Sequence, residues 1–202
     1  VLGRGAGVYV WDVQGKRYLD GMSAYSAVNL GHAHPRITRA LTEQASTLSM
    51  ISRAYHSDQL GLALQSLTSF FGYERCLPMN SGAEAVDTAI KIARRWGYLR
   101  KHIPENKAEI VVMDGNFHGR SLTLISASSN ALYREHFGPF IPGFKTVPFG
   151  DSEAIKAAIT PNTCAVLLEP IQGEAGIIIP PDGWLKEVRN ICDDNNVLLL
   201  AD

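Results

Sequence analysis

The chain has 202 residues, a formal net charge of −1, 46% hydrophobic residues and 19% charged residues. A balanced charge argues against a nucleic-acid binder or a polybasic membrane-surface protein, because both need clustered positive charge. No apolar run approaches the roughly 18 residues of a spanning helix, and no secretory signal opens the chain. The composition predicts a soluble globular protein with no nucleic-acid or membrane partner.

The three cysteines, Cys76, Cys164 and Cys192, are odd in number and widely spaced in apolar surroundings. They form neither a disulfide framework nor a zinc-ligand pattern, and we expect reduced thiols in an intracellular protein.

The first third of the chain predicts a small β-structure followed by helices. Residues 8–20 read as two short strands joined by a turn at Gly15. One helix is expected after Pro35 and another near Ser57, each with apolar residues at helical spacing.

Beyond residue 75 the pattern alternates between strands and helices. A short strand over 75–79 is followed by a long helix from about Gly82 to Leu99, in which Asp87 and Lys91 have the spacing of an ion pair. The expected packing stripe of this helix consists of Ala85, Ala89, Ile92, Ala93 and Trp96.

Four later strands are expected at 109–113, 145–148, 164–168 and 197–201, with helices near 151–159 and 182–193. This alternation predicts an α/β fold with a mainly parallel sheet and helices on both faces. The last strand is entirely apolar, as in strands buried on both faces, and needs covering helices. We therefore expect the chain to be part of a longer protein.

Ligands of an open parallel sheet bind outside the carboxyl ends of its strands. The segments at those ends carry glycines, a Phe-His pair, one arginine and several acids, and they are residues 80–84, 114–120, 150–151, 169–174 and 202. Their convergence on one edge predicts a single ligand site there.

Ser81-Gly-Ala-Glu84 fits a capping box, in which the serine and glutamate side chains bond free amides at a helix start. The same strand–glycine–helix junction also suits a phosphate, since the amides and the helix dipole attract anions. The two interpretations are compatible.

Other residues at this edge each have an ordinary and a functional interpretation. Phe117 is either a core residue or a stacking surface for a planar ligand, and Arg120 is either a surface residue or a carboxylate clamp. Glu169 and Asp202 follow apolar strands, where a carboxylate requires a cationic or N–H partner.

Three other motifs do not meet the requirements of a metal site, a dinucleotide-binding loop or a nucleophile elbow. His32 and His34 lack a third ligand with metal-site spacing, so no metal site is predicted. The glycines at 3–7 precede the first strand instead of following one, and residues 119–123 miss the last position of a nucleophile elbow.

Taken in order, five runs resemble the class III, pyridoxal-phosphate-dependent aminotransferases across essentially the whole chain. The runs are residues 23–32, 79–85, 115–120, 137–144 and 169–176. Asn-Ser-Gly-Ala-Glu-Ala, Phe-His-Gly-Arg and Glu-Pro-Ile-Gln-Gly-Glu are typical of the class. Tyr-Ser-Ala-Val-Asn and Gly-Pro-Phe-Ile-Pro-Gly-Phe favour its ornithine branch over the acetylornithine and 4-aminobutyrate branches.

The resemblance implies the fold type I of pyridoxal-phosphate enzymes. It assigns residues 1–25, with a β-hairpin, to a small domain, and residues 26–202 to a large cofactor-binding domain incomplete at its C-terminal side. It implies a homodimer or higher homo-oligomer, in the cytoplasm or the mitochondrial matrix.

The resemblance also implies roles for individual residues. Ser81, Gly82 and Ala83 would hold the cofactor phosphate, Phe117 would stack on the pyridine ring, His118 and Glu169 would lie near the cofactor, and Asp202 would bond the ring nitrogen. On the substrate side, Arg120 would grip a carboxylate, Tyr25 would bond the α-amino group of ornithine, and Glu174 would mask an arginine outside this chain.

The implied reaction transfers the δ-amino group of L-ornithine to 2-oxoglutarate, giving glutamate 5-semialdehyde and glutamate. The Schiff-base lysine of the class would lie beyond Asp202, so no catalytic residue is assigned within this chain. Two alternatives stay open. One is an acetylornithine or 4-aminobutyrate aminotransferase of the same class. The other is a truncated interaction module that lacks the Schiff-base lysine.

Overall fold

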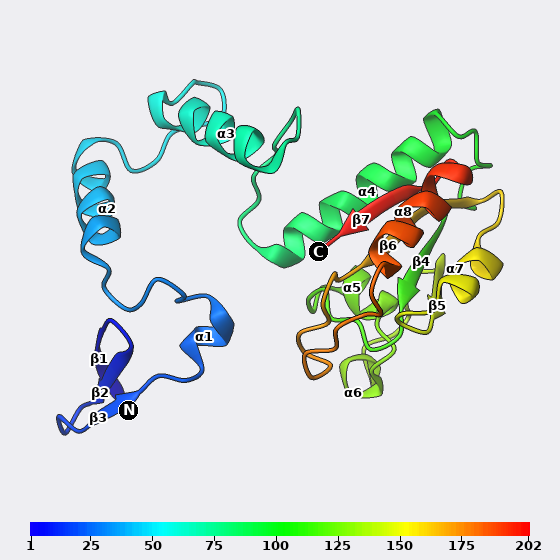
Figure 1. Ribbon diagram of the computed structural model, residues 1–202. Helices are drawn as coiled ribbons and strands as arrows, with labels where there is room; N and C mark the ends of the chain where they lie inside the picture. The colour runs from blue at the N-terminus through cyan, green and yellow to red at the C-terminus, as the bar shows by residue number, and fades with distance from the viewer. The chain divides into compact units, whose positions relative to one another are not determined.

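A computed structural model describes residues 1–202 and shows an α/β protein (Figure 1). The chain forms two compact units, Val1–Cys76 and Leu77–Asp202. None of the helices is long and apolar enough to cross a membrane. The assignment of residues 1–25 and 26–202 to different domains of a whole protein stays a prediction.

The first unit opens with an antiparallel three-stranded sheet in the order β1 (Leu2–Ala6), β2 (Tyr9–Asp12) and β3 (Arg17–Leu19). The predicted pair of strands within 8–20 is confirmed as β2 and β3. β1 was not predicted, because its two glycines and one arginine weaken the strand signal.

Three helical segments complete the first unit: α1 (Ser23–Ser26), α2 (Pro35–Thr47) and α3 (Asp58–Phe71). The predicted helix after Pro35 is confirmed, with the proline in the first turn. α3 begins where predicted, since the Ser57 side chain accepts from the amides of Gln59 and Leu60.

The second unit contains a four-stranded sheet in the order β5 (Phe144–Val147), β4 (Glu109–Met113), β6 (Thr163–Leu168) and β7 (Leu198–Ala201). Every neighbouring pair is parallel. The helices of this unit are α4 (Gly82–Leu99), α5 (Leu122–Ala127), α6 (Ala131–Arg134), α7 (Ser152–Ala158) and α8 (Trp184–Asp194). The predicted fold class is confirmed, with each of the four later strands within one residue of its expected range.

Helices cover both faces of this sheet, as the sequence predicted. In β4, Ile110 and Val112 pack in one cluster with residues of α4 and α5, whereas Val111 and Met113 pack in a second cluster with residues of α7 and α8. All four side chains are fully buried. The continuous apolar run of β4 therefore serves two cores at once.

The short strand expected over 75–79 does not form, and this prediction is wrong. The sheet of the second unit consists of β5, β4, β6 and β7, so residues 75–79 have no neighbouring strand. An extended segment becomes a strand only when another strand bonds its amides and carbonyls.

The packing stripe expected on α4 is only partly right: Ala93 is buried and Trp96 packs against the same core, whereas Ala85 and Ile92 are exposed. The buried residues are Val86, Ile90, Ala93 and Gly97. Apolar residues occupy two faces of this helix, so the periodicity did not decide which face meets the sheet. Gly97 decides it, because a Cβ there would lie 2.9 Å from the Cβ of Cys164 on β6.

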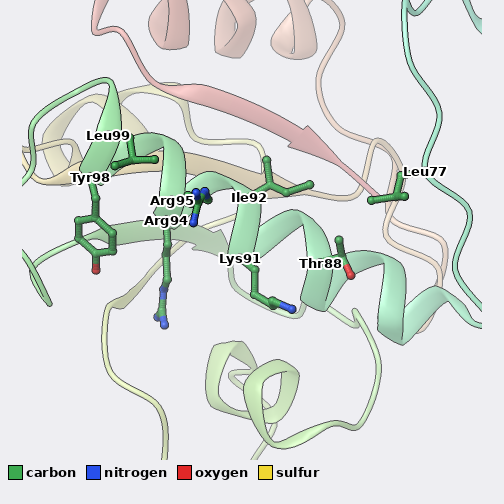
Figure 2. A pocket seen from close by; sticks show the side chains of 8 residues that line it. All are labelled: Leu77, Thr88, Lys91, Ile92, Arg94, Arg95, Tyr98 and Leu99. Carbon is green, nitrogen blue, oxygen red and sulfur yellow. The ribbon is translucent and has the colours of Figure 1, made fainter.

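The opposite face of α4 carries Ile92, which is 54% exposed, above an open hollow of about 600 Å³ (Figure 2). The hollow is lined by Leu77, Thr88, Lys91, Ile92, Arg94, Arg95, Tyr98 and Leu99. Asp87 and Lys91 form no ion pair, contrary to expectation. None of the predicted site residues lines this hollow.

All three cysteines are free thiols, as predicted. Burial raises the pKa of the Cys164 and Cys192 thiols to about 11, and both groups are therefore protonated at neutral pH.

Candidate active site

The order of the strands places a switch point between β4 and β6. The connection from β4 to β5 runs through α5, in the first core cluster, whereas the connection from β6 to β7 runs through α8, in the second. Helices that leave on opposite faces open a crevice at the carboxyl ends of the two strands. Residues 114–121 follow β4 and residues 169–178 follow β6, so both segments lie at the carboxyl ends of these two strands (Figure 1).

Asp202, at the end of β7, has His118 as its partner. The Nδ1 atom of His118 lies 2.8 Å from Oδ2 of Asp202, and the Asp202 amide donates to the Leu168 carbonyl at the end of β6. The His118 side chain is completely buried and that of Asp202 is 34% exposed. One carboxylate oxygen is therefore held by the histidine while the other remains available to a ligand.

Glu169 ties the segment after β4 to the segment after β6. Its Oε2 accepts from the Phe117 amide at 3.1 Å and its Oε1 from the Gly173 amide at 3.4 Å. The expectation that this acid requires an N–H partner is confirmed.

Two buried amides that were not predicted from the sequence hold the same segments. Gln172 is 1% exposed, and its Nε2 donates to the Asp114 carbonyl at 2.8 Å. Asn116 is 2% exposed and donates to the carbonyls of Met113 and Ala127. An amide in a polar loop gives no sequence signal that it is buried, so only the packing reveals these two residues.

The start of α4 confirms the serine half of the capping box, whereas the glutamate bonds the amide one residue before the N-cap. The Ser81 Oγ accepts from the Glu84 amide at 3.2 Å, and the Glu84 carboxylate accepts from the Asn80 amide at 2.9 Å. These bonds leave the amides of Gly82 and Ala83, in the first turn of an 18-residue helix, without a partner in the chain. A Cβ on Gly82 would meet nothing within 4 Å, which leaves room for a ligand.

Gly119 brings the Phe-His segment against this helix start. A Cβ at Gly119 would lie 2.9 Å from the Ala83 Cβ and 2.7 Å from the Leu124 Cδ1 atom, and the residue has a φ of 123°. Only glycine allows this approach. The structure thus brings Phe117, His118, Glu169 and Asp202 to one edge of the sheet. The loop that carries Phe117 and His118 packs against the first turn of α4.

Phe117 and Arg120 form an aromatic–cation cluster with Tyr133 of α6. The two ring centroids are 5.7 Å apart, and the Arg120 guanidinium carbon lies 5.3 Å from the Phe117 centroid and 5.8 Å from that of Tyr133. Arg120 and Tyr133 line a hollow of about 250 Å³ together with Ile125, Leu132 and Phe137. Tyr133 was not predicted from the sequence, since four residues of α6 carry too little periodicity.

Two predicted site residues lie outside this cluster. Glu174 is exposed in the loop after β6. Tyr25 belongs to the first unit and is 80% exposed on α1.

Comparison with known proteins agrees with this arrangement. The profile of aminotransferase class-III matches residues 1–202. An ornithine aminotransferase of Brevibacillus brevis is 57% identical over 202 residues, which are all of this chain and 51% of that protein. The chain spans about half the length of the curated relatives it matches.

Solved structures show the same fold. The ornithine aminotransferase of Toxoplasma gondii superposes with a TM-score of 0.98 at 41% identity, covering 100% of this chain and 48% of that one. An acetylornithine aminotransferase of Elizabethkingia anophelis has a TM-score of 0.85 at 50% identity, covering 100% and 49% respectively. The family profile matches the whole chain, and the site at the switch point agrees with it. The chain therefore belongs to the class-III aminotransferase family.

Proposed function

We propose that the chain is the N-terminal half of an ornithine δ-aminotransferase that uses pyridoxal 5'-phosphate. The observation that carries the proposal is the meeting of Phe117, His118 and Asp202 beside the free amides of Gly82 and Ala83. One end of such a site suits a phosphate and the other suits a protonated aromatic nitrogen.

The residues present fit this cofactor on chemical grounds. Two unpaired amides, an open Cβ position at Gly82 and the positive end of an 18-residue helix suit a phosphate. Asp202 keeps one oxygen free of His118 and suits a pyridinium N–H. Phe117 offers a ring beside the crevice, and Glu169 fixes the backbone of that residue.

When bound, the cofactor would supply an electron sink for the charge left on the substrate carbon. Asp202 would keep the ring nitrogen protonated, and the buried His118 would hold the carboxylate in place. Ser81, Gly82 and Ala83 would anchor the phosphate. The lysine that binds the cofactor covalently would come from the remaining half of the protein.

Substrate recognition would rest on three residues. The planar fork of Arg120 would bind a substrate carboxylate in two places, and the rings of Phe117 and Tyr133 orient the guanidinium. Tyr25 would bond the α-amino group of ornithine, which presents the δ-amino group to the cofactor. Glu174 would pair with an arginine of the other half until 2-oxoglutarate displaces it.

We expect Arg120→Ala in the full-length protein to raise the KM for ornithine and for 2-oxoglutarate. Loss of a bidentate, charge-assisted contact costs about 1.5–3 kcal/mol, which corresponds to roughly 10- to 100-fold. Steady-state kinetics with each substrate varied in turn measure the two KM values. Arg189→Ala, which removes a half-exposed arginine of α8 paired only with Asp193, is the matched control. Unchanged KM values for Arg120→Ala would remove this residue from the site.

The proposed function is tested by comparing amino donors. Full-length protein loaded with pyridoxal phosphate is assayed with ornithine, N-acetylornithine and 4-aminobutyrate, each with 2-oxoglutarate as acceptor. A kcat/KM highest for ornithine supports the proposal. Preference for N-acetylornithine would instead support the acetylornithine branch, to which one of the solved structures belongs. No turnover with any donor would contradict an aminotransferase.

The proposal includes a homodimer or higher homo-oligomer in the cytoplasm or the mitochondrial matrix. Exposed apolar side chains, such as Leu67, Phe70 and Phe71 on α3, form a surface that the other half of the protein or a second copy would cover.

A further inference from the structure

Tyr25 lies in a turn of unusual backbone conformation. Ser23, Ala24, Tyr25 and Ser26 all have positive φ values between 49° and 69°. L-residues other than glycine avoid this left-handed region, and four in succession require other contacts to hold them there. Strain of this kind concentrates at functional sites, and the Tyr25 side chain, 80% exposed, is the one large side chain of the turn.

Asp20 supplies the contacts at the start of this turn. Its Oδ1 accepts from the Ser23 amide at 2.9 Å and from the Met22 amide at 3.2 Å. The Ser23 hydroxyl closes the other side by donating to the Val28 carbonyl at 2.9 Å. The carboxylate therefore satisfies the amides from which the left-handed turn begins.

The His32 side chain bonds the other carboxylate oxygen of Asp20. Its Nε2 lies 2.7 Å from Oδ2 of Asp20, and the backbone of His32 exchanges two hydrogen bonds with Gly7, next to β1. A Cβ at Gly5 would lie 2.7 Å from the His32 ring, so glycine is required for the ring to pack there. The hydrogen bond from His32, followed by that from the Ser23 amide, lowers the pKa of Asp20, which keeps it ionised at neutral pH.

We propose that Asp20 is a positioning residue that fixes the Tyr25 turn and thereby sets the preference for an amino donor with a free α-amino group. The inference rests on the proposed function, because Tyr25 is the residue assigned there to the α-amino group. Asp20 itself acts through the turn: the small sheet holds His32, His32 holds Asp20, and Asp20 holds the backbone that carries Tyr25.

The test compares ornithine with 5-aminopentanoate, which is ornithine without its α-amino group, in the full-length enzyme. In Asp20→Ala we expect the ratio of kcat/KM for the two donors to fall about tenfold toward that of Tyr25→Ile, because a misplaced contact group loses its effect. The double variant should fall no further than Tyr25→Ile. The KM for 2-oxoglutarate should stay unchanged.

Asp12→Ala is the matched control. Asp12 also accepts from two nearby amides, those of Gln14 and Lys16, and from the Tyr18 hydroxyl, but it has no bond to residues 22–26. Its removal should leave the donor ratio unchanged. Asp20→Asn keeps an acceptor oxygen for the two amides and should retain most of the ratio. Where Asp20→Ala folds poorly, a ratio in Asp20→Asn as low as in Tyr25→Ile overturns the proposal that these two bonds fix the turn.

The outcomes separate the two proposals. A normal donor ratio in Asp20→Ala, with a lowered ratio in Tyr25→Ile, overturns the role of Asp20 and leaves the proposed function intact. A normal ratio in Tyr25→Ile contradicts the substrate role of Tyr25 in the proposed function, and the role of Asp20 falls with it. An equal loss in Asp12→Ala would also overturn the inference, since the effect would then be general to the small sheet.

Discussion

Asp202→Ala is expected to lower kcat of the full-length enzyme by about 100-fold or more, since removing one preorganised electrostatic partner of a reacting group has effects of this size. The structure gives two reasons. Asp202 follows the end of β7, beside the switch point, and one of its carboxylate oxygens is free for a ring nitrogen. It is also the hydrogen-bond partner of the completely buried His118. The measurements are single-turnover rates and the absorption spectrum of the bound cofactor.

Asp202→Asn separates these two roles. An asparagine oxygen can still accept from His118, so the melting temperature should stay closer to that of the parent than in Asp202→Ala, while kcat falls because the negative charge is gone. Asp182→Asn, an exposed acid ahead of α8, is the control and should change neither quantity. A kcat within about threefold of the parent in Asp202→Ala would contradict the assigned role.

Gly119→Ala is expected to lower the free energy of unfolding by about 3 kcal/mol, because backbone strain and overpacking each cost about 1–3 kcal/mol. The new Cβ would stand 2.7 Å from Leu124 Cδ1 and 2.9 Å from Ala83 Cβ, at a φ of 123°. Relief of this contact would move the Phe117–His118 segment away from the first turn of α4. Weaker cofactor retention should therefore accompany the loss of stability, and denaturation with parallel cofactor titration measures both.

Gly176→Ala provides the matched comparison for this prediction. Gly176 has a similar φ of 113°, but a Cβ there would meet nothing within 4 Å. Gly176→Ala should therefore lose only the free energy of backbone strain, about 1–2 kcal/mol. The difference in unfolding free energy between the two variants then measures the cost of the close contact with α4. Equal losses in both would show that the approach of Gly119 to Ala83 is unimportant.

Local features of the second unit were predictable from the sequence. The apolar run of β4 predicted a strand with cores on both sides, and Ser81 and Glu84 predicted the start of α4 together with the serine capping bond. Such features depend on residues within one turn or one strand, so neighbouring letters determine them. The motif runs likewise indicate the family without any geometry, because each run is contiguous in the sequence.

Other features depended on which strands and loops became neighbours. Residues 75–79 formed no strand because none lay beside them, and Gly97 turned α4 toward β6 although glycine carries no hydrophobic signal. His118 meets Asp202 across 84 positions and Gln172 meets Asp114 across 58. The sequence by itself determined the four parallel strands, the starts of α3 and α4 and the acids that required partners. The tertiary structure alone decided the partners, because the strand order β5-β4-β6-β7 brings together loops that are distant in the chain.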